Sequence, residues 1–156
     1  MKYGLFLYLL LFLSIPAFCQ VDTTQQIILN RKNSSAQQKK PYVILISADG
    51  FRYDYAKKYN TTHLLELANP GVKADYMLPS YPSLTFPNHY AIVTGLTPAH
   101  SGLVGNNFYD PARKETYISK NHRNVTDSTW YGGTPLWVLA ERQQMLSAAN
   151  YWVGSD

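Results

Sequence analysis

The stretch PSYPSLTFPNHYAIVTGLTPAHSGLVGNNFYD, residues 79–110, carries the pattern that decides the fold of this chain. Proline is tolerated in the first turn of a helix, where its missing N–H would lack a partner anyway. Pro87, followed by an apolar helical run, therefore predicts a helix that begins at or just after Thr85. The Thr85 hydroxyl would then face outward, where backbone N–H groups and the helix dipole favour an anion.

Just upstream, the sequence VILISADG at Val43–Gly50 indicates a buried strand that ends at Asp49. In open α/β sheets, ligands and metals collect at the carboxyl ends of the strands. A carboxylate at a strand end and a hydroxyl at a helix end, converging on one crevice, indicate metal-assisted attack on a phosphorus centre. The alternative is structural, because aspartate after a strand often forms a turn and threonine before Phe-Pro often caps a helix.

The composition is typical of one globular domain. The chain has 156 residues, of which 46% are hydrophobic and 15% are charged, enough for one modest core. The formal charge of +4 belongs to the N-terminal residues, since the part from Pro41 onward holds nine Lys and Arg against nine Asp and Glu. Nucleic-acid binding needs basic residues gathered on one folded face, and we expect no such patch.

The first 19 residues are typical of a signal peptide, with a basic residue, the apolar run Leu5–Leu13 and small residues at Ala17 and Cys19. Cleavage is expected before Gln20, which predicts a secreted or periplasmic protein; a lipid anchor on Cys19 is the less favoured alternative. The apolar run is too short for a membrane span. After cleavage no cysteine remains, so any metal must be held by oxygen and nitrogen.

Strand-like and helical segments alternate along the rest of the chain, after a polar linker at residues 20–40. This alternation predicts an α/β fold with a parallel sheet. The expected elements are strands at Tyr42–Ser47, Val72–Leu78 and Ser147–Val153, helices at Phe51–Tyr59, Thr61–Leu67, Phe86–Thr94 and Leu136–Met145, a loop at Thr97–Gly105, an extended piece at Asn106–Asp110 and a hairpin insertion within Pro111–Tyr131.

The chemistry of the proposed crevice follows from the residue types. A threonine hydroxyl is a weak nucleophile because its pKa lies far above neutral, and metal coordination stabilises its alkoxide. Asp49 is a natural ligand for an ion that also binds Thr85. Two metals about 4 Å apart can hold the attacking and leaving oxygens of an in-line displacement. A neutral amide donor such as Asn106 can meet the charge that develops on the other oxygens.

Five sequence blocks resemble one family: ILISADGFR, PSLTFPNHYAIVTGL, HSGLVGNNFYDP, GGTPLWVLAE and YWVGSD. Together they are similar to the N-terminal part of the nucleotide pyrophosphatase/phosphodiesterase family (type I phosphodiesterases), within the alkaline phosphatase superfamily. The resemblance implies an alkaline-phosphatase-like parallel sheet sandwiched by helices, incomplete at the C-terminus. Residues 41–156 would then be the N-terminal part of a phosphodiesterase catalytic domain, after a signal peptide at 1–19.

The resemblance also implies roles for individual residues. Asp49 would be a metal ligand, and Thr85 would be both a ligand and the nucleophile, passing through a phospho-threonine intermediate at a site with two Zn²⁺ or other divalent ions. Asn106 would stabilise a phosphate oxygen, and Phe86 would pack against a nucleobase. The family's remaining zinc ligands are expected beyond residue 156, so this chain would carry the nucleophile half of the site and be weakly active or inactive alone.

The chain departs from the family pattern at Leu84, where a basic residue is common, at the order His100-Ser101-Gly102 and in the absence of a proline before Gly154. These departures leave the substrate open: a nucleotide or another phosphodiester is expected. The alternatives are a phosphomonoesterase, a sulfatase or a lipid-headgroup diesterase of the same superfamily, or a non-catalytic remnant.

The histidines do not supply the missing ligands. His89 is expected in the core or behind the site, and His100 lies on a loop from which it can approach the crevice. His63 and His122 are expected to face solvent.

Overall fold

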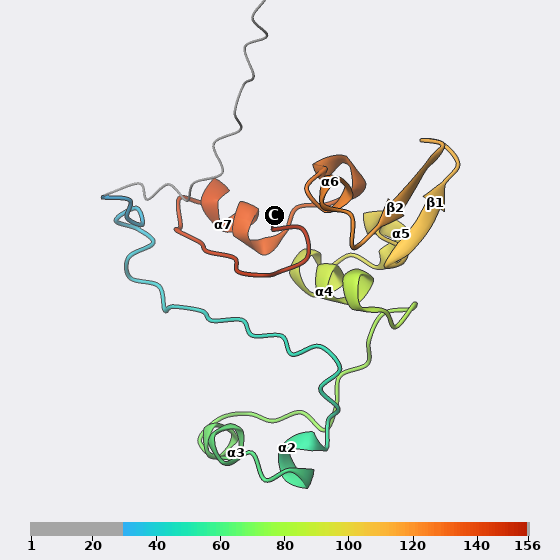
Figure 1. Ribbon diagram of the computed structural model, residues 1–156. Helices are drawn as coiled ribbons and strands as arrows, with labels where there is room; N and C mark the ends of the chain where they lie inside the picture. The colour runs from blue at the N-terminus through green and yellow to red at the C-terminus, as the bar shows by residue number, and fades with distance from the viewer. Residues whose placement is uncertain (1–29, 156) are drawn as a thin grey trace, which may run out of the picture. The chain divides into compact units, whose positions relative to one another are not determined.

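The computed structural model describes residues 30–155, so the predicted signal peptide lies outside the described residues. From Lys32 onward the chain forms a single structural unit, and Figure 1 shows its elements. In chain order they are α2 (Tyr55–Lys58), α3 (Thr62–Ala68), α4 (Thr85–Thr94), α5 (Pro98–Ser101), β1 (Asn107–Asp110), β2 (Glu115–Ile118), α6 (His122–Val125), the 3-10 helix η1 (Ser128–Trp130) and α7 (Leu136–Arg142).

Helix α4 forms where the sequence predicts it. Leu84 precedes the helix in an extended conformation, with φ −112° and ψ 157°, and Pro87 lies in the first turn. The helix ends at Gly95, which adopts a left-handed conformation with φ 70° and donates its N–H to the carbonyl of Ala91. Glycine is favoured there because it has no Cβ to clash in that region.

The core is largely aromatic and includes one face of α4, at Pro87, Tyr90 and Val93. Its most buried hydrophobic side chains are those of Tyr90, Val93, Leu103, Tyr117 and Trp130. Tyr117 and Trp130 meet edge to face with ring centroids 5.4 Å apart. Pairs in this geometry add about 0.5–1.5 kcal/mol beyond the area that they bury. Burial raises the pKa of the Tyr90 hydroxyl, because the ionised form would lose solvation.

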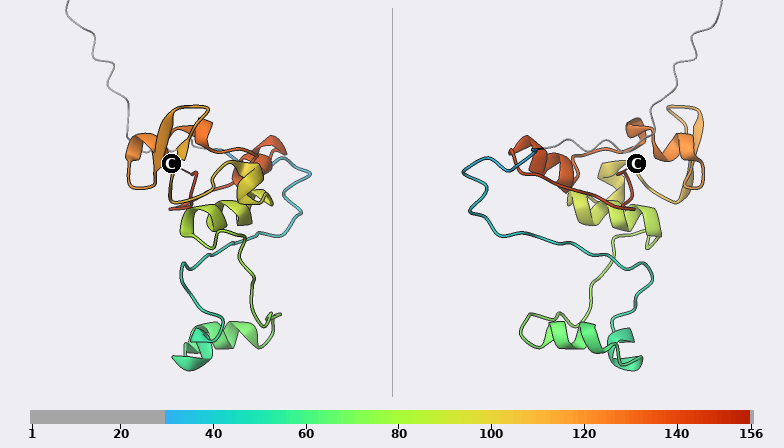
Figure 2. Two further views of the ribbon diagram at one scale, coloured as in Figure 1. Left: turned by 90° about the vertical axis from the view of Figure 1, so that its right-hand side faces the viewer. Right: turned by 60° about the vertical axis from the view of Figure 1, so that its left-hand side comes forward.

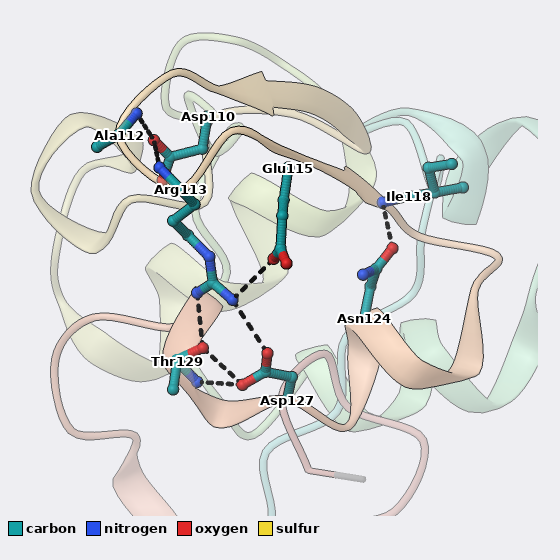
Figure 3. A network of polar contacts seen from close by, with 8 residues as sticks. All are labelled: Asp110, Ala112, Arg113, Glu115, Ile118, Asn124, Asp127 and Thr129. Carbon is teal, nitrogen blue, oxygen red and sulfur yellow. Dashed lines mark hydrogen bonds and ion pairs between the residues drawn. The ribbon is translucent and has the colours of Figure 1, made fainter.

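Strands β1 and β2 form an antiparallel hairpin in which Phe108 pairs with Tyr117. The Asp110 carboxylate accepts from the backbone N–H of Ala112 at 2.8 Å and of Arg113 at 3.3 Å, which closes the turn (Figure 3). The expected extended piece at Asn106–Asp110 is thus confirmed as β1.

Arg113 ties the hairpin to the segment that follows α6, as Figure 3 shows. Its guanidinium donates to Thr129 Oγ1 at 2.6 Å and to Asp127 Oδ2 at 3.1 Å. The same group lies 3.8 Å from the centroid of the Trp130 ring. A cation over an aromatic face is attracted by the ring quadrupole, so Arg113 joins the polar network to the aromatic core.

The three strands predicted at Tyr42–Ser47, Val72–Leu78 and Ser147–Val153 are wrong for the part of the chain that the structure describes. In that part the only sheet is the β1–β2 hairpin. Figure 1 and Figure 2 draw residues 41–48 as an extended tube without a strand arrow, and Ile44 is 84% exposed.

The physical reason is that a strand needs a second segment to accept its backbone hydrogen bonds, which no local sequence pattern supplies. The three runs therefore form no strand among the described residues. The family-like parallel sheet is not observed there. Trp152 and Val153, by contrast, pack against the core without forming a strand.

Two of the remaining predicted helices are shorter in the structure. The stretch Phe51–Tyr59 holds only α2, and Leu136–Met145 holds α7. The helix predicted at Thr61–Leu67 is confirmed as α3, but the Thr61 hydroxyl donates to the carbonyl of Ala56 and caps nothing.

Part of the predicted polar linker contacts the segment after α7. The backbone N–H of Ser34 donates to Gln144 O at 3.1 Å, and Asn33 Oδ1 accepts from the N–H of Leu146 at 2.6 Å.

Candidate active site

Asp49 and Thr85, thirty-six positions apart in the sequence, lie together in the structure. The Thr85 hydroxyl donates to Asp49 Oδ2 across 3.2 Å. Asp49 is exposed and is followed by Gly50, whose φ of 66° turns the chain. The strand expected before Asp49 is absent from the described residues, yet the extended chain still delivers the carboxylate to the start of α4.

The position of Thr85 on α4 leaves its hydroxyl available for chemistry. Thr85 is the first helical residue, and the N-cap position belongs to Leu84, with no side-chain cap hydrogen bond. The hydroxyl therefore contacts a carboxylate and does not cap the helix. Backbone N–H groups in the first turn of a helix face outward and favour a negative group nearby.

Asn106 completes the same cluster. Its Oδ1 accepts from the backbone N–H of Phe86 at 2.9 Å, and its carbonyl accepts from Ser119 N–H at 2.9 Å, at the open end of the hairpin. Because Oδ1 faces an N–H donor, the amide orientation is fixed, and the NH₂ group is the part of this side chain that can donate to a ligand. The structure thus brings Asp49, Thr85 and Asn106 to the N-terminus of α4.

Phe86 is half-buried. Its ring meets Tyr117 edge to face with centroids 6.3 Å apart, and it packs against the core. The structure therefore places Phe86 beside the cluster, but with part of its ring turned to the protein interior.

Two neighbours on α4 support Thr85. Asn88 Nδ2 donates to the carbonyls of Pro82 and Leu84, each at 2.9 Å. Sequence reasoning missed Asn88; the signal that was available is a side-chain amide in the first turn of the helix, within reach of the backbone carbonyls that precede the helix. His89 Nδ1 lies 2.9 Å from the carbonyl oxygen of Thr85.

His89 occupies the position expected for a residue behind the site. The Trp152 indole donates to the His89 carbonyl at 2.9 Å, and the two rings meet edge to face at 5.9 Å. His100 Nδ1 is within hydrogen-bond distance of Thr97 Oγ1, at 2.8 Å. His63 and His122 are exposed, as predicted.

Asp49 and Thr85 can supply some of the ligands of a divalent-metal site, but not a complete set. Asp49 and Thr85 offer two oxygen atoms in contact with each other. Zinc takes four ligands in most protein sites, drawn from nitrogen, sulfur and carboxylate oxygen. Residues 30–155 contain no group of three or more His, Cys, Asp or Glu that could hold a metal ion.

A charged pair lies shortly after Asp49. Arg52 Nε donates to Asp54 Oδ1 at 2.6 Å, and a second contact joins Nη2 to Oδ2. The hydrogen bond from Arg52 holds the pKa of the Asp54 carboxyl below its usual range, and Asp54 in turn raises the pKa of Arg52. Arg52 is exposed and Asp54 is partly exposed, so water screens the pair and it contributes little to stability.

A separate cavity of about 210 Å³ lies elsewhere on the molecule. Tyr90, Tyr131, Trp137 and Arg142 are among the residues that line it. Neither Asp49 nor Thr85 lines it.

Comparison with known proteins identifies the family to which the chain belongs. A model of the type I phosphodiesterase / nucleotide pyrophosphatase family matches residues 43–156. The chain belongs to this family, which confirms the resemblance carried by the five sequence blocks. Family membership implies the alkaline-phosphatase-like α/β fold.

Individual relatives agree with the family match. An uncharacterized pyrophosphatase/phosphodiesterase of Schizosaccharomyces pombe is 40% identical over 143 residues, 91% of this chain and 30% of the yeast protein. Rat ectonucleotide pyrophosphatase/phosphodiesterase family member 3 is 40% identical over 75% of this chain and 14% of its own length. A mouse bis(5'-adenosyl)-triphosphatase is 36% identical over 83% of this chain and 28% of its own length.

The chain thus spans less than a third of the length of these relatives. Among the described residues, no helix is long and apolar enough to cross a membrane.

Proposed function

We propose that this chain supplies the nucleophile half of a site that hydrolyses phosphodiester or pyrophosphate bonds of nucleotides. The observation that carries the proposal is the 3.2 Å contact between Thr85 Oγ1 and Asp49 Oδ2 at the start of α4. The family match and relatives whose names include pyrophosphatase, phosphodiesterase and bis(5'-adenosyl)-triphosphatase support the substrate class.

In the proposed reaction, Thr85 attacks and then releases the phosphoryl group. The Thr85 oxygen bonds to phosphorus as the bond to the leaving oxygen breaks, and the hydroxyl proton is lost to solvent. The product is a phospho-threonine, which carries the nucleoside ester when the substrate is a nucleotide. Water then attacks the same phosphorus atom, and the threonine hydroxyl is restored.

The neighbouring side chains have separate tasks. Two divalent ions, Zn²⁺ in the proposal, would lower the pKa of the Thr85 hydroxyl and offset the charge of the phosphate. Asp49 and Thr85 would be among the ligands, and the other ligands would come from outside residues 30–155. The Asn106 NH₂ donates to a non-bridging oxygen, where charge builds in the transition state. The exposed part of the Phe86 ring packs against the substrate base.

The proposal extends to the rest of the protein. We infer that residues 1–19 direct secretion or periplasmic export, and that residues 41–156 are the N-terminal part of the catalytic domain. The extended apolar run Tyr42–Ser47 is proposed to join the parallel sheet of the complete domain.

The test is hydrolysis of a p-nitrophenyl ester of a nucleotide by the full-length protein, with p-nitrophenyl phosphate and p-nitrophenyl sulfate as competing substrate classes. Thr85→Ala and chelation of divalent ions are each expected to lower turnover of the nucleotide ester by more than a hundredfold, whereas Thr85→Ser retains part of it. The matched control is Thr62→Ala, because Thr62 is likewise the first residue of a helix, α3.

Full activity of Thr85→Ala would overturn the proposed nucleophile. Faster hydrolysis of the phosphate monoester or of the sulfate would reassign the substrate class. Tight binding of the nucleotide ester without turnover in the presence of zinc would identify a non-catalytic protein.

A further inference from the structure

The amide of Asn88 holds the chain that leads into α4. Its Nδ2 donates to the carbonyl oxygens of Pro82 and Leu84, each at 2.9 Å. The backbone N–H of Asn88 also donates to the Leu84 carbonyl, at 3.2 Å. Asn88 therefore binds both the segment before the helix and the residue at its N-cap position, which are also joined by the Leu84 N–H to the Pro82 carbonyl at 2.8 Å.

The conformation of Leu84 sets the direction in which the Thr85 side chain leaves the backbone. Leu84 is extended, with φ −112° and ψ 157°, and Thr85 is the first helical residue. The ψ angle of Leu84 fixes the plane of its carbonyl group, and the Asn88 amide binds the oxygen of that carbonyl. Extended and helical conformations are separate energy wells, and without the side-chain bond the Leu84 carbonyl is held only by the backbone N–H of Asn88, so the junction is less tightly constrained.

We propose that Asn88 is a positioning residue for Thr85, which keeps Thr85 Oγ1 beside Asp49 Oδ2 by holding the carbonyls of Pro82 and Leu84. The proposal rests on the function inferred above for Thr85. Asn88 acts through the backbone of α4 and touches none of the reacting atoms. A displacement of about 1 Å at a reacting group can lower the rate by about a hundredfold. Greater freedom of the backbone at Leu84 and Thr85 is therefore expected to lower kcat.

Asn88→Asp separates positioning from folding. Aspartate has the shape of asparagine but no N–H, so neither hydrogen bond can form and two carbonyl oxygens face a negative carboxylate. A negative charge near the N-terminus of a helix is otherwise favourable. The variant is therefore expected to keep helix α4 while it loses the two side-chain hydrogen bonds to the segment before the helix.

The matched control is Asn124→Asp. Asn124 lies on α6, and its Oδ1 accepts from the backbone N–H of Ile118 at 3.0 Å. Aspartate can accept the same hydrogen bond, so this variant makes the identical chemical change and adds the identical charge while the bond to Ile118 stays in place.

The experiment measures kcat and KM for a p-nitrophenyl nucleotide ester in the full-length protein, with the thermal unfolding midpoint of each variant. For Asn88→Asp we expect a kcat lower by about 10–100-fold and a KM within about threefold of wild type, because binding groups stay in place while the geometry of attack is disturbed. Asn124→Asp is expected to match wild type in both constants.

A second readout does not depend on turnover. Because the Phe86 N–H donates to Asn106 Oδ1 at the same junction, its hydrogen exchange reports the order of the helix start. Asn88→Asp is expected to speed exchange of the Phe86 amide at least tenfold relative to Asn124→Asp, as measured by NMR.

Wild-type kcat and wild-type Phe86 exchange in Asn88→Asp would overturn the positioning role while Thr85→Ala remains inactive, which leaves the proposed function standing. A fall in kcat that only follows a lowered unfolding midpoint would also overturn it. Full activity of Thr85→Ala would instead overturn the proposed function, and the role of Asn88 with it.

Discussion

The backbone N–H of Phe86 donates to Oδ1 of Asn106 at 2.9 Å, across twenty positions of sequence. This bond joins the start of α4 to the start of the β1–β2 hairpin, and so to the aromatic core beneath the hairpin. It also decides which end of the Asn106 amide is left to meet a substrate. The Asn106 side chain is thus held by a backbone group of α4, beside Thr85.

Asn106→Asp tests the donor role of this amide. The carboxylate still accepts from Phe86 N–H, so the fold is expected to remain, but the NH₂ donor is replaced by a negative charge facing phosphate. Turnover of the nucleotide ester is expected to fall by about 10²–10³-fold, the usual cost of losing a transition-state donor. The control is Asn107→Asp, whose Oδ1 accepts from Ser119 N–H and is likewise replaceable by a carboxylate oxygen. Wild-type turnover in Asn106→Asp would contradict the role.

The Arg113 network predicts a pH-dependent contribution to stability. Hydrogen bonds from Thr129, and then from Arg113, lower the pKa of the Asp127 carboxyl below its ordinary value. A lowered folded-state pKa stabilises the fold above the unfolded-state value of about 3.9, and this gain is lost as the pH falls through the folded-state pKa. Asp127→Asn is therefore expected to lower the thermal midpoint at pH 7, and the gap from wild type should narrow below about pH 4.

Thermal melts of both proteins between pH 7 and pH 2 measure this gap. Asp75→Asn serves as the control, since it removes the same charge from an exposed loop position. A gap that stays constant with pH, or that widens in acid, would contradict the assigned role of the Asp127 carboxylate.

The aromatic core around α4 predicts a steep contrast between two leucines. Leu103 is fully buried, with 0% exposure, whereas Leu67 on α3 is 73% exposed. Leu103→Ala is expected to lower the free energy of unfolding by about 2–5 kcal/mol, because it removes buried area and leaves a cavity. Leu67→Ala is expected to change it by less than about 0.5 kcal/mol. Urea unfolding of both variants measures the two values. Equal losses of unfolding free energy would contradict the assignment of Leu103 to the core.

The unpaired apolar run at residues 42–47 predicts self-association of this chain when expressed by itself. Exposed extended segments with free backbone groups pair with other chains, and Ile44 is 84% exposed. Ile44→Lys is expected to reduce the associated fraction in light scattering, because a charge on an edge segment opposes pairing. Gln38→Lys adds the same charge at an exposed position outside the run. Equal association in both variants would rule out this segment as the cause.

Helix α4 is predicted well because its signals are local. The strands are predicted poorly because they depend on distant segments. Pro87 and Gly95 act on their own backbone angles, so the sequence alone fixes where this helix begins and ends. A strand depends on a partner segment, which is why the apolar runs at Tyr42–Ser47 and Val72–Leu78 were assigned wrongly for the described residues. The role of Asn88 cannot be predicted from the sequence, because its side chain binds two backbone carbonyls. Every residue has a backbone carbonyl, so no residue type marks the position of an acceptor.

The candidate site could be predicted further than the sheet. Motif chemistry and the family resemblance predict Asp49, Thr85 and Asn106 as site residues, and the structure brings them to one helix end. Their chemical roles stay predictions. Phe86 shows what residue patterns omit, because its contact with Tyr117 depends on how the hairpin packs against α4.

The sharpest test of the proposed nucleophile is capture of the covalent intermediate on Thr85. The full-length protein is mixed with a nucleotide ester, quenched in acid within milliseconds, digested and analysed by mass spectrometry. We predict that the peptide containing Thr85 gains the mass of one nucleotidyl group, and that Thr85→Ser gains it too, whereas Thr85→Ala does not. Rapid turnover with every peptide unmodified, and an equal rate for Thr85→Ala, would contradict the proposed mechanism.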